Sequence, residues 1–171
     1  MSGAQPDLAT RAAELRATFD AGFATPARLD QGATVDLLSI RLENEAYALR
    51  LSEIAGLVAG HAVTPLPAEM SGLFGIAGFR GSIMPVYDLA ALLGHAPAAA
   101  CRWLAIARAA PVALAFATLE GHLRVPSDAI VPDHDASDPT QRIVEFLRRP
   151  DRASPIVDIA LLLDRISQQP R

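Results

Sequence analysis

The side chains that could catalyse a reaction or bind a metal are few and scattered in this sequence of 171 residues. The four histidines show neither the His-x-x-x-His nor the His-Glu-x-x-His spacing of metal sites; they are His61, His95, His122 and His134. The single cysteine, Cys101, excludes an internal disulfide, and its place at the start of a predicted strand favours a packing role. Ser52 and Ser82 lie in no Gly-x-Ser-x-Gly elbow. These patterns predict no catalytic residue, metal or cofactor.

The charged residues argue against phosphate and nucleic-acid chemistry. All 15 cationic side chains are arginines, so the chain has neither a P-loop lysine nor a Schiff-base lysine. The net charge of −4 provides no basic field for nucleic acid. The acidic pair Asp133 and Asp135 lies in a polar segment and is expected to be solvated.

Four glycines recur at every third position, and their spacing allows two interpretations; they are Gly72, Gly75, Gly78 and Gly81. A phosphate-binding loop should open a helix and recruit a basic residue together with Ser or Thr. Here the glycines lead into a β-like run, Ser82 to Tyr87. We therefore expect a close backbone approach or a bulge at the corner of a barrel.

Arg80 stands between Phe79 and Gly81, immediately before that run. Its planar guanidinium can bond several carbonyl or carboxylate oxygens at once, and arginine is enriched in binding hot spots. From the residues alone, two roles are about equally supported: a structural arginine that bonds loop carbonyls, and an anchor in a protein interface.

The elements that must position these residues are mostly short strands. Apolar and polar residues alternate through 38–43 and 47–52, and Asn44 between them tolerates the positive φ of a hairpin turn. Asp88 is expected to cap a short helix over 89–93, which Gly94 ends. Further strand-like segments and a last helix follow, at 102–108, 112–117, 142–147, 154–157 and 158–166.

Residues 1–34 are predicted to form an amphipathic helix and a linker. Leu8, Ala12, Leu15 and Phe19 follow helical spacing over 7–19, in a helix that either packs on its own domain or docks a partner. Residues 22–34 mix Gly, Pro and Thr without periodicity. The sequence shows no signal-peptide h-region and no apolar window near 18 residues, which predicts a cytoplasmic protein without direct membrane insertion.

Three pairs of segments match in the same order along the chain. LLSIRL from residue 37 parallels WLAIAR from 103, ALRLSEIAG from 48 parallels ALAFATLEG from 113, and PVYDLAALL from 85 parallels PIVDIALLL from 155. Collinear offsets indicate two copies of one supersecondary unit. Short strands with frequent turns favour small barrels, because closure removes exposed sheet edges. We therefore predict two β-barrel lobes, near residues 35–94 and 101–164.

The segment GLFGIAGFRGSIMPVYDLAALLG, residues 72–94, resembles the CheW family of bacterial chemotaxis coupling proteins. That family carries a glycine, an apolar pair, Asn-Leu-Arg-Gly, an apolar strand and Pro-Val-x-Asp-Leu. The matching residues are Gly75, Arg80, Gly81, Ile83, Pro85, Val86, Asp88 and Leu89. Gly78 and Phe79 replace the Asn and Leu, and FLRRPDRAS stands where the second lobe usually has Gly-x-Gly.

The resemblance extends over roughly residues 35–165, through EAYALRLSEIAGLV and PIVDIALLL. It implies two tandem SH3-like, five-stranded barrels in a CheW-like domain of residues 35–171, with a short helix after each lobe. It also implies a structural motif built from Gly75, Gly81, Pro85, Asp88, Pro155 and Asp158.

The function that the resemblance implies is that of a non-enzymatic adaptor recruited to membrane receptor arrays. Such proteins bind the regulatory domain of a chemotaxis histidine kinase through the first lobe. The candidate residues here are Glu53, Ile54, Leu57, Val58, Arg80, Ile83 and Val86, with Glu53 at an acidic position implicated in kinase binding. They also bind the cytoplasmic tip of a chemoreceptor near the groove between the lobes, for which the candidates are Phe79, Phe116 and Leu119.

Two alternatives stay open at the level of the sequence. One is an adaptor of the same fold in a non-chemotaxis array, such as surface motility or second-messenger signalling. The other is a ligand-binding or enzymatic double barrel that uses the cleft between lobes. The second alternative requires convergent polar or titratable residues in that cleft, and the sequence offers none.

Overall fold

A computed structural model describes residues 33–67, 70–98, 100–132, 143–149 and 153–168. The predicted N-terminal helix and the segment containing Asp133, His134 and Asp135 lie outside the described residues. Within the described ranges the chain is mostly β. None of the helices described there is long and apolar enough to cross a membrane.

The first half of the described chain contains five strands, a 3₁₀ turn and one short helix. They are β1 (Thr34–Leu42), β2 (Glu45–Arg50), η1 (Leu51–Glu53), β3 (Ile54–Ala59), β4 (Leu73–Phe79), β5 (Ser82–Asp88) and α2 (Leu89–Leu92). The second half repeats this order with one strand added. Its elements are β6 (Trp103–Ala107), β7 (Ala113–Phe116), β8 (Thr118–Pro126), η2 (Ser127–Ala129), β9 (Ile130–Pro132), β10 (Ile143–Arg148), β11 (Ala153–Val157) and α3 (Ile159–Gln168).

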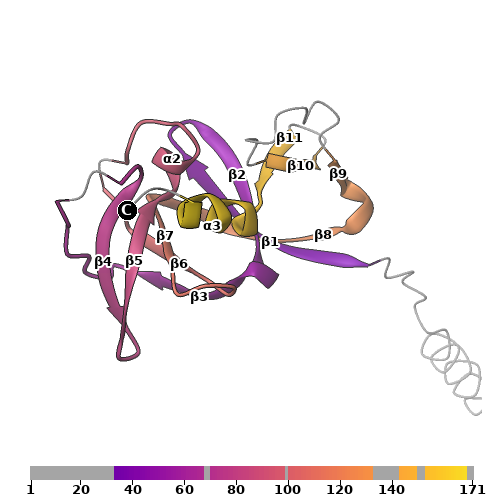
Figure 1. The fold of residues 1–171 in the computed structure, drawn as a ribbon. Helices are drawn as coiled ribbons and strands as arrows, with labels where there is room; N and C mark the ends of the chain where they lie inside the picture. Colours follow the sequence, from indigo (N-terminus) through magenta and orange to yellow (C-terminus); the bar gives the residue numbers. More distant parts are fainter. Residues whose placement is uncertain (1–32, 68–69, 99, 133–142, 150–152, 169–171) are drawn as a thin grey trace, which may run out of the picture. The chain divides into compact units, whose positions relative to one another are not determined.

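The strands form two sheets, which Figure 1 shows side by side. One has the order β8-β1-β2-β11-β10-β9 and the other the order β3-β6-β7-β5-β4. Neighbouring strands are antiparallel except for the parallel pairs β11–β2 and β5–β7. The predicted mostly-β fold, with a short helix after each repeat, is confirmed. The first sheet has six strands instead of the predicted five, because the short β9 pairs with β10.

Each sheet combines strands from both sequence repeats. Strands β1 and β2 of the first repeat share a sheet with β8, β9, β10 and β11 of the second, and β6 and β7 of the second share the other sheet with β3, β4 and β5 of the first. Corresponding strands therefore occupy corresponding places in the two sheets. The sheets do not follow the predicted division into 35–94 and 101–164, because the chain changes sheet after its second strand in each repeat, at η1 and at Ala117.

The Pro-x-x-Asp motif forms the same junction in both repeats. Pro85 and Pro155 each lie one residue before the parallel pairing begins, so neither is required to donate an N–H to the parallel neighbour. Asp88 accepts hydrogen bonds from Ala90 N at 2.9 Å and Ala91 N at 3.4 Å, and Asp158 accepts one from Leu161 N at 2.9 Å. Both aspartates therefore cap helices, and the capping role predicted for Asp88 is confirmed.

The glycine-rich segment makes the close backbone approach that its spacing predicted. A Cβ atom on Gly75 would lie 2.3 Å from the carbonyl oxygen of Thr64, and β4 is irregular between Leu73 and Gly75. The β1–β2 turn differs from its prediction. Glu43, not Asn44, has the positive φ of 49° in that turn.

Apolar side chains fill three clusters. The largest contains Leu49, Leu89, Leu114, Phe116 and Val157, from both sheets and α2. A second lies within the sheet of β3–β7 around Val86, Leu104 and Ala115. The third lies within the other sheet around Leu37 and Ile156.

Candidate protein-binding surface

The β4–β5 hairpin ends in a two-residue turn made of Arg80 and Gly81. Phe79 pairs with Ser82 on either side of it, and φ is 48° at Arg80 and 82° at Gly81. Positive φ at both central residues matches the twist of the flanking strands. Glycine adopts this conformation freely, whereas a residue with a Cβ pays about 1–2 kcal/mol. Arg80 is therefore held in a strained conformation at the tip of a hairpin.

Aromatic rings pack beneath this turn. The guanidinium carbon of Arg80 lies 5.1 Å from the ring centroid of Phe79, and the His61 ring meets Phe79 edge-on at a centroid distance of 6.5 Å. His61 Nε2 lies 2.7 Å from the carbonyl oxygen of Gly78. Because a carbonyl only accepts, this nitrogen must carry the proton. A Cβ on Gly56 in β3 would lie 4.0 Å from the Phe79 ring, so this part of β3 is next to the ring.

An exposed apolar residue stands beside the turn. Ile83 is 75% exposed. Its partner across the hairpin is Gly78, which has no side chain that could cover Ile83. Arg80 is also exposed, while Phe79 and Val58 are half-buried against one cluster. We call the set Val58, His61, Phe79, Arg80 and Ile83 the hairpin surface. Ile83 points to the face of the hairpin opposite Phe79, because side chains alternate along β5 and its neighbour Met84 packs in the same cluster as Phe79. The hairpin surface therefore includes both faces of the hairpin tip. Its arginine, aromatic ring and exposed aliphatic side chain are groups that anchor protein interfaces.

Three of the residues predicted to bind a partner are buried in the structure. Val86 and Phe116 are 0% exposed and Ile54 is 4% exposed, so they belong to the core and cannot form a contact surface. Their strands alternate between an inner and an outer face, and the apolar sequence on both faces did not reveal which residues point inward.

The receptor-groove candidates are not gathered in one groove. Phe116 is buried in the largest cluster, and Leu119 is half-buried against the same cluster. Phe79 packs against the second cluster instead. Leu57 is likewise separated from Val58, its neighbour in β3, because the two side chains pack against different clusters. His61, by contrast, joins the hairpin surface although no sequence pattern singled it out.

Glu53 lies at the end of η1, directly before β3. Its Oε2 accepts a hydrogen bond from the backbone N–H of Ile159 at 3.1 Å. Burial raises the pKa of its carboxyl group, and the hydrogen bond from Ile159 opposes that rise. The carboxylate therefore has a partner within the protein.

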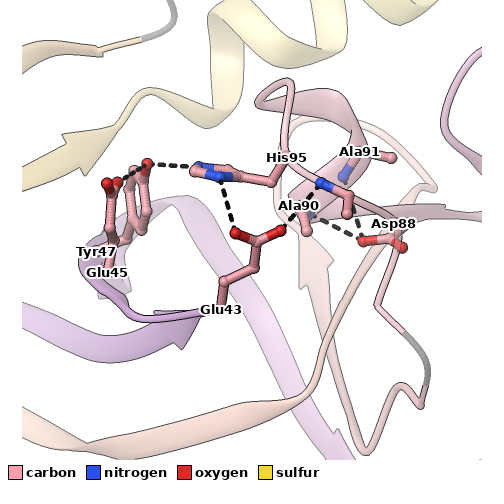
Figure 2. A network of polar contacts seen from close by, with 8 residues as sticks. Glu43, Glu45, Tyr47, Asp88, Ala90, Ala91 and His95 are labelled. Carbon is pink, nitrogen blue, oxygen red and sulfur yellow. Dashed lines mark hydrogen bonds and ion pairs between the residues drawn. The ribbon is translucent and has the colours of Figure 1, made fainter.

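A polar network fixes the segment after α2, as Figure 2 shows. Tyr47 donates to Glu45 Oε2 at 3.0 Å, and its oxygen lies 2.7 Å from His95 Nε2. Since the tyrosine proton is directed to Glu45, His95 Nε2 must supply the proton of the second bond. Burial, followed by the effect of Glu45, raises the pKa of Tyr47 to about 12, which keeps the phenol protonated.

The same segment forms a wall of a cavity of about 360 Å³. Glu43 accepts from Ala96 N at 3.1 Å, and Asp88 accepts from Ala98 N at 2.8 Å. The other lining residues are mainly alanines, with Arg41 and Thr118. Arg41 forms an ion pair with Glu120. Of the charged residues that line this cavity, Glu43 is thus bound to backbone and Arg41 to another side chain.

Cys101 has the packing role that its position predicted. It is half-buried against the second apolar cluster. Burial, with a smaller contribution from Asp88, raises the pKa of its thiol to about 11. Since the thiolate is the reactive form, this cysteine is a poor nucleophile.

Two small sheets, each built from strands of both repeats, define a two-lobed β fold. A family model described as the CheW-like domain matches residues 36–167, which include both sheets. The chain belongs to the CheW family, whose members are non-enzymatic scaffolds. The crystal structure of the scaffolding protein TtCheW from Thermoanaerobacter tengcongensis superposes with a TM-score of 0.66. The match covers 75% of this chain and 91% of that one at 19% identity, and it shows a common fold. No curated protein sequence matches significantly.

Proposed function

We propose that this protein couples a chemotaxis histidine kinase to the cytoplasmic tip of a chemoreceptor, and that the hairpin surface binds the regulatory domain of the kinase. Membership of the CheW family supports the scaffold role. The observation that carries the assignment of the surface is the strained Arg80 beside the 75% exposed Ile83. The fold bears the strain of an arginine at positive φ, and strained residues cluster at functional sites.

The receptor tip binds at a different place on the protein. Binding of the receptor tip recruits the protein and the kinase from the cytoplasm to the receptor arrays. An adaptor needs two separate surfaces so that both partners can be held at once. Leu119 stays a candidate for the receptor contact because it is half-buried. Phe79 is assigned to the kinase contact because it packs under Arg80.

Titration calorimetry with the purified regulatory domain of the organism's own chemotaxis kinase tests the proposal. Ile83→Ser should weaken binding about tenfold or more, as expected for a hot-spot residue. Leu66→Ser is the matched control, because Leu66 is an exposed apolar residue (41%) outside the hairpin surface. Equal affinities for wild type and Ile83→Ser would remove the hairpin surface from the kinase contact. A wild type that binds neither this domain nor the receptor tip would refute the coupling role.

A further inference from the structure

Glu53 joins two parts of the chain that are distant in sequence. It is the last residue of η1, the crossover that carries the chain from one sheet to the other. Ile159, which donates its N–H to Glu53, is the first residue of α3. The first N–H groups of a helix have no partner within the helix. Glu53 and Asp158 satisfy two of them, at Ile159 and Leu161.

The backbone on both sides of Glu53 is held by one arginine. Arg108 Nε donates to Ser52 O at 2.7 Å, and its Nη2 donates to Ile54 O at 2.9 Å. The backbone N–H of Arg108 donates to Glu53 O at 2.8 Å. The crossover is thus attached to Arg108, directly after β6, through backbone and guanidinium hydrogen bonds, and the Glu53 side chain adds a hydrogen bond to the start of α3.

This attachment sets where β3 begins. β3 starts at Ile54, lies at the edge of its sheet and pairs with β6, with an irregularity between Ile54 and Gly56. A Cβ on Gly56 would be in contact with the tip of the Phe79 ring, at 4.0 Å, and Val58 packs against the same cluster as that ring. A shift of the crossover would therefore move the floor of the hairpin surface.

We propose that Glu53 is a positioning residue for the hairpin surface: it ties the N-terminus of α3 to the crossover before β3 and does not itself contact the kinase. This inference rests on the proposed function for its effect on binding. The bond needs an acceptor oxygen at the end of a long side chain, and it does not need a charge. A residue that paired with a cation of the partner would need the charge.

Glu53→Gln and Glu53→Ala separate these two roles. Glutamine keeps an oxygen at the same reach, so its affinity for the kinase regulatory domain should stay within about twofold of wild type. Alanine removes the acceptor and should weaken binding about three- to tenfold, the size expected for a change transmitted through packed elements. Asp164→Asn is the control for net charge, because Asp164 is exposed on α3.

Amide hydrogen exchange on the free protein supplies a readout independent of binding. A cavity of about 290 Å³ lies at this junction, and Glu53, Arg108 and Ile159 are among its lining residues. Glu53→Ala should speed exchange at Ile159 and along β3, whereas Glu53→Gln should not. The inference is overturned if Glu53→Gln loses as much affinity as Glu53→Ala, or if exchange in β3 is the same in all three proteins. If wild type does not bind the kinase domain, the proposed function fails and the exchange data alone decide the inference.

Discussion

The carbonyl oxygen of Thr64 occupies the place where a side chain on residue 75 would begin, 2.3 Å from the Cβ that Gly75 lacks. The two segments meet there through paired hydrogen bonds, Thr64 N to Ile76 O at 2.8 Å and Ile76 N to Thr64 O at 2.9 Å. This contact attaches the segment after β3 to β4, the first strand of the hairpin that carries Arg80. The glycine therefore serves close approach of two backbones.

Gly75→Ala should consequently destabilise the protein. The new methyl group would overlap backbone that cannot rotate away, and overpacking costs about 1–3 kcal/mol or more. Gly78→Ala in the same strand is the matched control, because nothing lies within 4 Å of a Cβ at that position. Chemical denaturation measures both. A Gly75→Ala protein as stable as Gly78→Ala would contradict the steric account.

Arg80→Asn should separate folding from binding. Asparagine adopts positive φ more readily than arginine, so the strain in the turn decreases. The variant loses the contact with the Phe79 ring, which at an exposed site is worth about 0.5–1 kcal/mol. We expect a free energy of unfolding equal to that of wild type or up to about 1 kcal/mol higher, together with clearly weaker kinase binding in calorimetry.

Arg148→Asn provides the control for charge, since Arg148 is exposed on β10 in the other sheet. It should leave kinase affinity unchanged. A large loss of stability in Arg80→Asn would assign the arginine the structural role instead, which is the first of the two roles that the sequence left open.

The two capping aspartates should differ in their importance although they occupy equivalent places in the repeat. Asp88 is 3% exposed and accepts from Ala90, Ala91 and Ala98, whereas Asp158 is half-buried and accepts from Leu161. Asp88→Ala leaves one buried and two partly buried donors unpaired, at about 1–3 kcal/mol for a buried group and less for the others. Asp158→Ala should cost about 1 kcal/mol, as for an ordinary N-cap. Urea denaturation of the two variants checks the order, and equal losses would contradict it.

Much of this fold could be predicted from the sequence, because the sequence signals for its turns and helix ends lie within short segments. Proline followed by an aspartate cap marks the strand-to-helix junction in both repeats, at Pro85 and at Pro155. The turn at Gly81 and the end of α2 at Gly94 both use glycine at positive φ, 82° and 88°. The geometry of such turns and helix ends depends on residues that are close together in the chain, so the local sequence pattern predicts it.

The exchange of strands between the two repeats could not be predicted from local sequence patterns. Two copies of a strand sequence can pair within a repeat or across repeats with the same local hydrogen bonding, and long-range packing decides between them. The same limit explains the errors at Val86 and Phe116, whose strands are apolar on both faces. It also explains why His61 was missed: its place under the turn depends on the register of β3, β4 and the segment between them.

A pH dependence of stability should follow from Glu53. Burial raises its pKa in the folded protein above the value of 4.5 that it has when exposed, as in the unfolded chain. The folded state then binds the proton more tightly, so this group stabilises the protein fully below pH 4.5, and that contribution is lost as the pH rises through the folded pKa. Glutamine cannot titrate. The stability of Glu53→Gln relative to wild type should therefore increase from pH 4 towards pH 7, measured as a difference of unfolding free energies so that the other carboxylates cancel. A difference that is constant with pH would show that the hydrogen bond from Ile159 balances burial, and a change in the opposite direction would show that the hydrogen bond outweighs burial.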